Sequence, residues 1–269
     1  MGDTERSRNF ERISIVSLST CEYRESSRKE RPLSVWPDLA TRLEAAELMD
    51  DLTIGGAELL QALHQLRWIN RLLGGAWPVR EGVRRLWAQV GCPPRLSILD
   101  IGAGSGDVNR ALLRWADQQT LDLRITLIDI HPETCAAAAA YYQDEPRVQV
   151  QQGDLFDLAP DQADIVTASL FLHHFADTQL PAVWAALLRA ARIGVVVNDL
   201  HRHPVAWICI RVATQLLSRN RMIRHDGPLS VRRSFRGADF ARLRSLPGMF
   251  SLTYGWRPFF RYLVIVRRV

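Results

Sequence analysis

A glycine-rich loop is the clearest chemical feature of the sequence. Residues 100–107 have the sequence Asp-Ile-Gly-Ala-Gly-Ser-Gly-Asp and lie between a buried-strand pattern at 96–101 and a helical pattern at 109–118. Glycines at such a position let the backbone turn sharply and approach a ligand closely. A dinucleotide fingerprint requires glycine where Asp107 stands, and a P-loop requires a lysine that this loop does not have. The loop therefore predicts a nucleoside ligand without phosphates, with a glycine turn that binds nothing as the alternative.

Acidic residues follow the next two predicted strands. Asp129 stands at the end of the second strand, where a carboxylate can accept hydrogen bonds from both ribose hydroxyls. Ile130 offers adenine an apolar face, and Asp154 after the third strand can accept from the adenine amine. Each acid alone is typical of a solvated loop, but together they favour a cationic ligand. S-adenosylmethionine is both a nucleoside without phosphates and a cation. The predicted cofactor-binding residues are Asp100, Gly102, Gly104, Gly106, Asp129, Ile130, Asp154, Leu155 and Ser169.

Histidines concentrate at the same predicted edge, because the ligand of an open α/β sheet lies beyond the carboxyl ends of its strands. His173 and His174 follow the fourth predicted strand, and His201 and His203 follow the fifth. A histidine can accept a proton near neutral pH, as methyl transfer to a hydroxyl or an acidic carbon requires. We predict His174 and His201 as catalytic residues, one of them the general base. The alternative for each is a structural or helix-capping histidine.

A substrate lid is predicted at 201–236, after the fifth strand. Its apolar helix at 203–218 is either plain core or one wall of an aromatic or acyl substrate pocket. Arg232 or Arg233 could hold a carboxylate or phenolate by charge-assisted hydrogen bonds, or could belong to a solvated basic face. The predicted substrate-binding residues are His173, Trp207, His225, Arg232 and Arg233, and Trp68, Asn70, Arg71 and Trp77 are further candidates.

Short β-rich runs alternate with helical patterns after Pro94, which predicts βαβ units and a parallel sheet. The last two runs are so closely spaced that their strands must be antiparallel. Before Pro94, apolar spacing predicts three helices, at 39–49, 59–73 and 79–90. The predicted strands are 96–101, 123–130, 148–152, 163–169, 193–198, 249–256 and 260–266, and the helices after Pro94 are 109–118, 132–143, 180–191, 203–218 and 235–246.

Four motifs follow one another in an order typical of one enzyme family: 100–107, Asp129, 153–154 and 164–175. Together they resemble class I S-adenosylmethionine-dependent methyltransferases. The resemblance implies an α/β, Rossmann-like fold with a seven-stranded sheet in the order 3-2-1-4-5-7-6, the last strand antiparallel and the cofactor over the first three strands. The run Phe-Leu-His-His-Phe at 171–175 is most similar to small-molecule methyltransferases of quinone biosynthesis and of bacterial polyketide-associated groups.

The chain is predicted to have three parts. A tail at 1–35 mixes arginine, glutamate and serine without a sustained period and is expected to be mobile. A helical appendage at 36–94 is expected to cover the mouth of the active site or to form a dimer interface, so either a monomer or a homodimer is predicted. The methyltransferase domain is predicted to occupy 95–269.

Charge is unevenly distributed along the chain. Its 269 residues include 34 basic and 29 acidic side chains, yet residues 201–269 hold 14 arginines against two acids, Asp226 and Asp239. This basic quarter raises an RNA methyltransferase as one alternative, and a non-catalytic cofactor-binding scaffold is another. The Asn/Asp-Pro-Pro-aromatic run that resembles base-amine methyltransferases is missing after the fourth strand. We therefore expect no nucleic-acid partner but a small aromatic, phenolic or polyketide/quinone-like acceptor, methylated on oxygen or carbon.

Four arginines near the end of the chain are expected to point to solvent, because strand alternation places them on the outer side of the last two strands. The four cysteines lie far apart without paired spacing, so we expect neither disulfides nor a metal site. The most apolar stretch, 205–217, is too short to span a bilayer, and the N-terminus is not typical of a secretory signal, so a soluble cytoplasmic enzyme is predicted. The four arginines are Arg257, Arg261, Arg267 and Arg268.

Overall fold

The computed structural model describes residues 37–246, 249 and 251–268, so the predicted tail at 1–35 lies outside the described residues. No helix among these residues is long and apolar enough to cross a membrane. The strands are β1 (Arg95–Ile101), β2 (Asp122–Asp129), β3 (Val148–Gln152), β4 (Ala163–Ser169), β5 (Ala191–Leu200), β6 (Thr253–Arg257) and β7 (Arg261–Arg267). The helices are α1 (Gly56–Leu72), α2 (Ala76–Gln89), α3 (Asn109–Gln118), α4 (Pro132–Tyr141), α5 (Leu180–Ala190), α6 (Pro204–Leu217), α7 (Arg221–Arg233) and α8 (Gly237–Leu243), with the 3-10 helices η2 (Leu48–Asp50), η3 (Leu155–Asp157) and η4 (Leu172–His174).

The seven strands form one sheet in the order β3-β2-β1-β4-β5-β7-β6. β7 runs antiparallel to both of its neighbours, β5 and β6, whereas all other neighbouring strands are parallel. The predicted Rossmann-like fold, its strand order and its antiparallel last strand are therefore confirmed.

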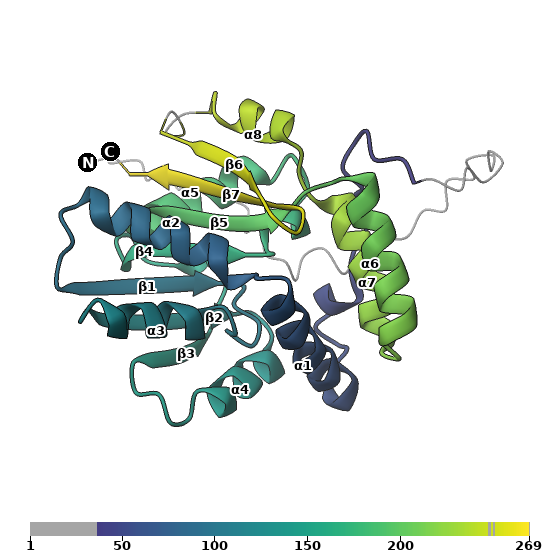
Figure 1. Ribbon diagram of the computed structural model, residues 1–269, viewed down its shortest axis with the longest axis horizontal. Helices are drawn as coiled ribbons and strands as arrows, with labels where there is room; N and C mark the ends of the chain where they lie inside the picture. Colours follow the sequence, from purple (N-terminus) through teal and green to yellow (C-terminus); the bar gives the residue numbers. More distant parts are fainter. Residues whose placement is uncertain (1–36, 247–248, 250, 269) are drawn as a thin grey trace, which may run out of the picture.

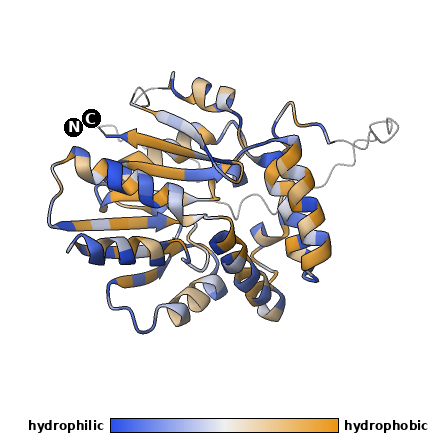
Figure 2. Cartoon of the chain, in the orientation of Figure 1, coloured by the Kyte–Doolittle hydropathy of each residue, from blue (hydrophilic) through white to orange (hydrophobic). Residues whose placement is uncertain are grey.

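Two hydrophobic clusters enclose the sheet. α2, α3 and α4 cover one face, and α5 and α8 cover the other (Figure 1). The central strands are apolar on both faces, as buried parallel strands must be, and appear as hydrophobic ribbons in Figure 2. Trp184 of α5 and Phe240 of α8 are among the largest fully buried side chains. This double layer makes the sheet a rigid support for the strand ends.

α2 packs directly on the sheet, although it lies within the predicted appendage. A Cβ at Gly82 would come within 2.4 Å of Val196 Cγ1, so glycine is what lets α2 approach β5 this closely. Val83 and Leu86 of the same helix are buried in the cluster on that face. α2 therefore belongs to the layer that covers the sheet.

Helices α1, α6 and α7 gather beyond the carboxyl ends of the parallel strands (Figure 1). α6 packs along α7, and α7 also contacts α1. α7 was not predicted, because Gly227 and Pro228 are typical of a turn. Here a Cβ at Gly227 would lie 3.0 Å from Thr214 Cγ2, so the glycine allows the close approach of α6 and α7.

The predicted helix at 39–49 is wrong, because residues 37–47 are not helical and only η2 follows them. The buried Arg202 side chain donates to the carbonyl oxygens of Leu39 (3.0 Å) and Ala40 (3.3 Å). These long-range hydrogen bonds satisfy backbone groups that a helix would have satisfied locally. Tertiary contacts therefore override the helical spacing of the apolar residues.

Candidate functional site

A cavity of about 1170 Å³ lies at the carboxyl ends of the parallel strands, where α1, α6 and α7 gather. Two groups of residues in its lining are called the loop region and the histidine region. The loop region consists of Gly102, Gly104, Asp129, Ile130, Asp154, Leu155 and Ser169, and the histidine region consists of Glu47, Asp50, His173, His174, His201 and Arg233.

The glycine loop after β1 needs glycine for two different reasons. Gly102, Gly104 and Gly106 all have a positive φ, a conformation that L side chains rarely adopt. A Cβ at Gly102 would lie 2.1 Å from the Phe171 ring, and one at Gly106 would lie 2.5 Å from Leu127. A Cβ at Gly104 would meet no atom of the described residues within 4 Å. Gly104 therefore faces open space in the cavity, whereas Gly106 serves packing and does not line it.

Two acids of the loop region are fixed by backbone N–H groups. Asp129 Oδ2 accepts from the N–H of Gly104 at 2.9 Å, and its Oδ1 accepts from that of His131 at 3.0 Å. Burial raises the pKa of Asp129. Asp154 accepts from the N–H of Phe156 at 2.9 Å and so caps η3. Both carboxylates are thus held in place at the ends of β2 and β3, where the sequence predicts them.

Asp100 holds the loop and does not line the cavity, although it was predicted among the binding residues. Its carboxylate is buried and accepts from Thr167 Oγ1 and from Asn109 Nδ2, both at 2.6 Å. Burial raises the pKa of Asp100 to about 6. Since these bonds tie β1 to β4 and to the start of α3, Asp100 fixes the backbone from which the glycines project.

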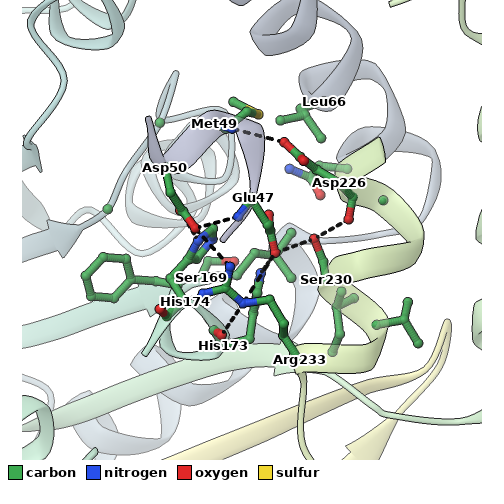
Figure 3. Close-up of a pocket in the computed structure, with 18 of the residues that line it drawn as sticks. Glu47, Met49, Asp50, Leu66, Ser169, His173, His174, Asp226, Ser230 and Arg233 are labelled. Atoms are coloured by element: carbon green, nitrogen blue, oxygen red, sulfur yellow. Dashed lines mark hydrogen bonds and ion pairs between the residues drawn. The ribbon is translucent and has the colours of Figure 1, made fainter. Parts of the chain in front are cut away.

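Two histidine–carboxylate pairs occupy the histidine region (Figure 3). His173 Nδ1 lies 2.7 Å from Asp199 Oδ1, and both side chains are buried. His174 Nδ1 lies 2.5 Å from Asp50 Oδ1. Burial alone would lower the pKa of His174, but the carboxylates of Glu47 and Asp50 outweigh it and raise the pKa to about 9. At neutral pH the His174 imidazole is therefore protonated.

Arg233 of α7 connects these pairs to the helical layer. Its guanidinium donates to Asp50 Oδ2 at 2.9 Å and to the carbonyl oxygens of His173 (3.1 Å) and His174 (2.6 Å). Burial would raise the pKa of Asp50, but His174 and Arg233 outweigh it, so the pKa is lowered. Arg233 therefore orients both histidine backbones and neutralises one carboxylate.

The face of α7 one and two turns before Arg233 fixes the segment around η2. Ser230 Oγ donates to Glu47 Oε1 at 3.0 Å. The Asp226 carboxylate accepts from the N–H groups of Leu48 (2.8 Å) and Met49 (3.1 Å). Sequence reasoning missed Glu47 and Asp50, because their partners on α7, Ser230 and Arg233, lie 183 residues away in the chain.

His201 differs from His174 in its protonation state. Burial, reinforced by the neighbouring His203, Arg236 and Arg202, lowers the pKa of His201 to about 4. Its Nδ1 has no hydrogen-bond partner among the described residues. The ring lies 5.0 Å from that of Tyr262. His201 is therefore neutral at neutral pH and can take up a proton.

Some of the residues predicted to bind substrate line the cavity and others do not. His173 and Arg233 line it, whereas Trp207, His225 and Arg232 do not. The reason is helical phase, because residues next to each other on a helix point in different directions. Asn70 of α1 lines this cavity and also a smaller one, which Trp68 and Arg71 of α1 and Trp77 of α2 line as well.

Arg261 was expected to point to solvent, and this expectation is wrong. The residue is 2% exposed and lines the cavity, because β7 lies inside the sheet between β5 and β6. Its Nη2 donates to Asn70 Oδ1 at 3.3 Å, whereas Nε and Nη1 have no hydrogen-bond partner among the described residues. Burial lowers the pKa of Arg261 to about 10, so the guanidinium remains charged at neutral pH.

The loop region lies in a part of the chain with known relatives. Residues 98–194 match a family model described as a methyltransferase domain. The chain therefore has a methyltransferase domain at 98–194, and its sheet has the class I methyltransferase fold. It is an enzyme, and its cofactor is S-adenosylmethionine. No curated protein sequence matches the methyltransferase.

Solved structures share the fold of the methyltransferase at low sequence identity. A methyltransferase from Aquifex aeolicus is 13% identical with a TM-score of 0.52, over 78% of this chain and 98% of that chain. Human N-acetylserotonin methyltransferase is 18% identical with a TM-score of 0.52, over 79% of this chain and 56% of that chain. The CMeT domain of the citrinin polyketide synthase is 16% identical with a TM-score of 0.50, over 64% of this chain and 46% of that chain. The methyltransferase thus spans about half the length of the last two structures, and these identities show the fold alone.

The loop region fits the cofactor of the methyltransferase. The space at Gly104 lets a ligand approach the backbone, and the Asp129 carboxylate beside it can accept from ribose hydroxyls. Asp154 and Ile130 line the neighbouring strand ends, where the adenine would lie. The unpaired guanidinium nitrogens of Arg261 suit the carboxylate of the methionine part.

Proposed function

We propose that the enzyme transfers a methyl group to oxygen or carbon of a small aromatic, phenolic or polyketide/quinone-like acceptor. One cavity joins the loop region to the histidine region, and this observation carries the proposal. Its volume of about 1170 Å³ exceeds the roughly 300–1,000 Å³ typical of ligand pockets, which leaves room for an acceptor beside the cofactor. Apolar side chains also line this cavity and suit a ring system: Leu59, Leu63, Leu66, Ile69, Ile210, Phe259 and Phe260.

The enzyme's own residues bind and orient the two reactants. When bound, S-adenosylmethionine supplies a methyl group on a sulfonium. Asp129, Asp154 and Arg261 line the cavity, where the two carboxylates would hold the nucleoside and the guanidinium would pair with the cofactor carboxylate. Helices α6 and α7, within the predicted lid at 201–236, close the acceptor side and exclude water. Holding the acceptor in line with the methyl group removes much of the entropic barrier to transfer.

His201 is the proposed general base, and His174 is the proposed electrostatic partner of the acceptor. With a pKa near 4, His201 is neutral at neutral pH, and a neutral imidazole has one ring nitrogen that can accept the acceptor proton. His174, with a pKa near 9, carries a positive charge that stabilises an acceptor oxyanion. The two histidines predicted as catalytic thus have different proposed roles: His201 accepts the proton, and His174 stabilises the oxyanion.

Three of the fourteen arginines in the basic C-terminal quarter interact with the protein itself or line the cavity. Arg202, Arg233 and Arg261 are buried, with 2%, 6% and 2% of their surface exposed. They bind carbonyl oxygens and carboxylates of the protein or line the cavity. These charges are therefore unavailable to a phosphate backbone.

The test begins with calorimetric titration of the full chain with S-adenosylmethionine, followed by transfer of a labelled methyl group to a panel of phenols, polyketide-like ketones and RNA. We expect saturable cofactor binding, label on a phenol or an acidic carbon, and no label on RNA. Asp129→Asn should weaken cofactor binding about tenfold and lower transfer at limiting cofactor, whereas Asp122→Asn on the exposed start of the same strand should change neither. Label on RNA with a steep salt dependence would overturn the proposal.

A further inference from the structure

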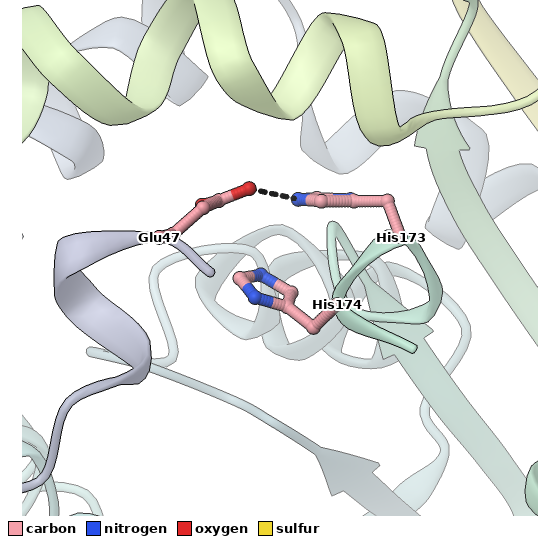
Figure 4. A group of neighbouring side chains, drawn as sticks. All are labelled: Glu47, His173 and His174. Atoms are coloured by element: carbon pink, nitrogen blue, oxygen red, sulfur yellow. Dashed lines mark ion pairs between the residues drawn. The ribbon is translucent and has the colours of Figure 1, made fainter. Parts of the chain in front are cut away.

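Glu47, His173 and His174 form a cluster of metal-binding side chains in the wall of the cavity (Figure 4). One possible ligand atom from each lies within 4.8 Å of the other two. His173 Nε2 is 3.6 Å from Glu47 Oε1. In a tetrahedral zinc site with ligands at about 2.0–2.1 Å, neighbouring ligand atoms are about 3.4 Å apart. The spacing of the cluster therefore requires only small side-chain movements to hold an ion.

Both imidazoles are oriented as in known metal sites. The histidines that bind metals usually donate their other ring N–H to a carboxylate, which fixes the tautomer and the ring orientation. Here Nδ1 of His173 pairs with Asp199, and Nδ1 of His174 pairs with Asp50. Asp199 is itself fixed, because it also accepts from the N–H of His173 at 3.2 Å. Nε2 is thus the ring nitrogen that each histidine can offer to an ion. On His174 the ion would replace the Nε2 proton, so the positive charge beside the acceptor would then come from the ion.

The third ligand and the local charge favour a cation at the same point. The Glu47 side chain is 5% exposed and is held by Ser230 Oγ. Glu47, Asp50 and Asp199 place three carboxylates around the cluster, and two arginines contact it: Arg233, and Arg42, whose Nη2 donates to the His173 carbonyl oxygen at 3.3 Å. Buried carboxylates are stable only when paired or when they surround a metal ion. A divalent cation would balance the excess negative charge.

We propose that Glu47, His173 and His174 bind one divalent ion of the zinc class and leave a coordination position open to the cavity. Two histidines and one glutamate are the ligand set of catalytic zinc sites, whereas magnesium and calcium prefer oxygen ligands alone. The ion's role rests on the proposed function: the open position would bind the acceptor oxygen, whose O–H bond breaks more easily there, with the proton passing to His201. The proposed site has no cysteine ligand, so the wide spacing of the cysteines in the sequence does not exclude it.

The experiment uses the full chain, freed of metal with a chelator and titrated with Zn²⁺ by calorimetry. We expect about one ion per chain in the wild type. Glu47→Gln and His174→Gln should weaken binding at least about 100-fold, and Asp50→Asn about 10–100-fold. His64→Ala, which changes an exposed histidine on α1, is the matched control and should bind as the wild type does. Thermal melting and cofactor titration of each variant identify those that fail to fold.

Spectroscopy of the wild type provides a readout that needs no variant. X-ray absorption at the zinc edge should show two imidazoles and oxygen ligands, and Co²⁺ should give the visible absorption of a site with fewer than six ligands. No saturable Zn²⁺ binding, no imidazole ligands, or equal affinity in folded Glu47→Gln and His174→Gln would overturn the site. Stoichiometric Zn²⁺ without transfer to any acceptor would contradict the proposed function only, and full transfer by a chain that binds no Zn²⁺ would contradict the metal site only.

Discussion

The loop region and the histidine region share one cavity but are held together in different ways. The loop region is fixed by backbone N–H groups close in sequence, such as the bonds from Gly104 to Asp129 and from Phe156 to Asp154. The histidine region is fixed by side chains from distant segments, with Glu47 and Ser230 lying 183 residues apart. Changes in the loop region should therefore affect cofactor affinity, whereas changes in the histidine region should affect turnover or the stability of the fold.

The largest effect is expected for His201→Gln. Loss of the general base should lower kcat by about 10²–10⁴-fold and leave the Kd of S-adenosylmethionine unchanged. Because the pKa of His201 is lowered to about 4, the neutral form is lost as pH falls through 4, and kcat/KM of the wild type should fall with it. Steady-state kinetics over pH 3.5–8, within the range where the fold persists, measure this. His225→Gln, at a half-exposed histidine outside the cavity, should behave as the wild type. Turnover retained by His201→Gln would show that His201 is not the base.

A pair of adjacent arginines tests whether buried charges hold the histidine region together. Arg233→Gln removes the partner of Asp50 and of two carbonyl oxygens, and should lower the free energy of unfolding by about 3–5 kcal/mol. Arg232→Gln, one residue earlier on α7 and outside the cavity, should change it by less than about 1 kcal/mol. Urea unfolding measures both. Similar losses in the two variants would show that the network around Arg233 does not stabilise the fold.

Gly102 and Gly91 both have a positive φ, so their alanine variants distinguish the cost of backbone strain from a loss of cofactor binding. Gly102→Ala and Gly91→Ala both place a side chain at positive φ, at a cost of about 1–2 kcal/mol. Only at Gly102 does the new Cβ also meet the Phe171 ring, which adds about 1–3 kcal/mol and disturbs the loop. We expect the Kd of S-adenosylmethionine to rise about 10–100-fold in Gly102→Ala and to stay constant in Gly91→Ala, as measured by calorimetry. An equal response would mean that the loop region does not bind the cofactor.

The smallest effect is expected for Asp129→Asn, which keeps the shape of the side chain but removes its charge. Hydrogen bonds to a charged group are worth about 1.5–3 kcal/mol, and an amide retains part of this, so the Kd of S-adenosylmethionine should rise about tenfold. Asp122→Asn, at the exposed start of β2, is the control. An unchanged Kd in both variants would remove Asp129 from the cofactor site.

Much of the fold and of the loop region follows from local patterns. The alternation after Pro94 predicts the strands, and the strand order is confirmed. Asp129 and Asp154 are correctly placed at strand ends, because parallel strands bring their carboxyl ends to one edge. The predicted helix at 39–49 is wrong, because the Arg202 side chain forms hydrogen bonds with the backbone of that segment. The predicted exposure of Arg261 is wrong, because β7 lies inside the sheet.

The sequence by itself determines the sheet, the glycine loop and the acids beside it, since each depends on residues a few positions apart and on the period of a strand or helix. Only the tertiary structure decides that Glu47 and Asp50 meet His173 and His174. It also decides that Arg233 turns into the cavity whereas Arg232 does not. The physical reason is that these contacts depend on the rotation of each helix about its axis and on the pairing of buried charges. Both are determined only when all the partners are present in the folded protein.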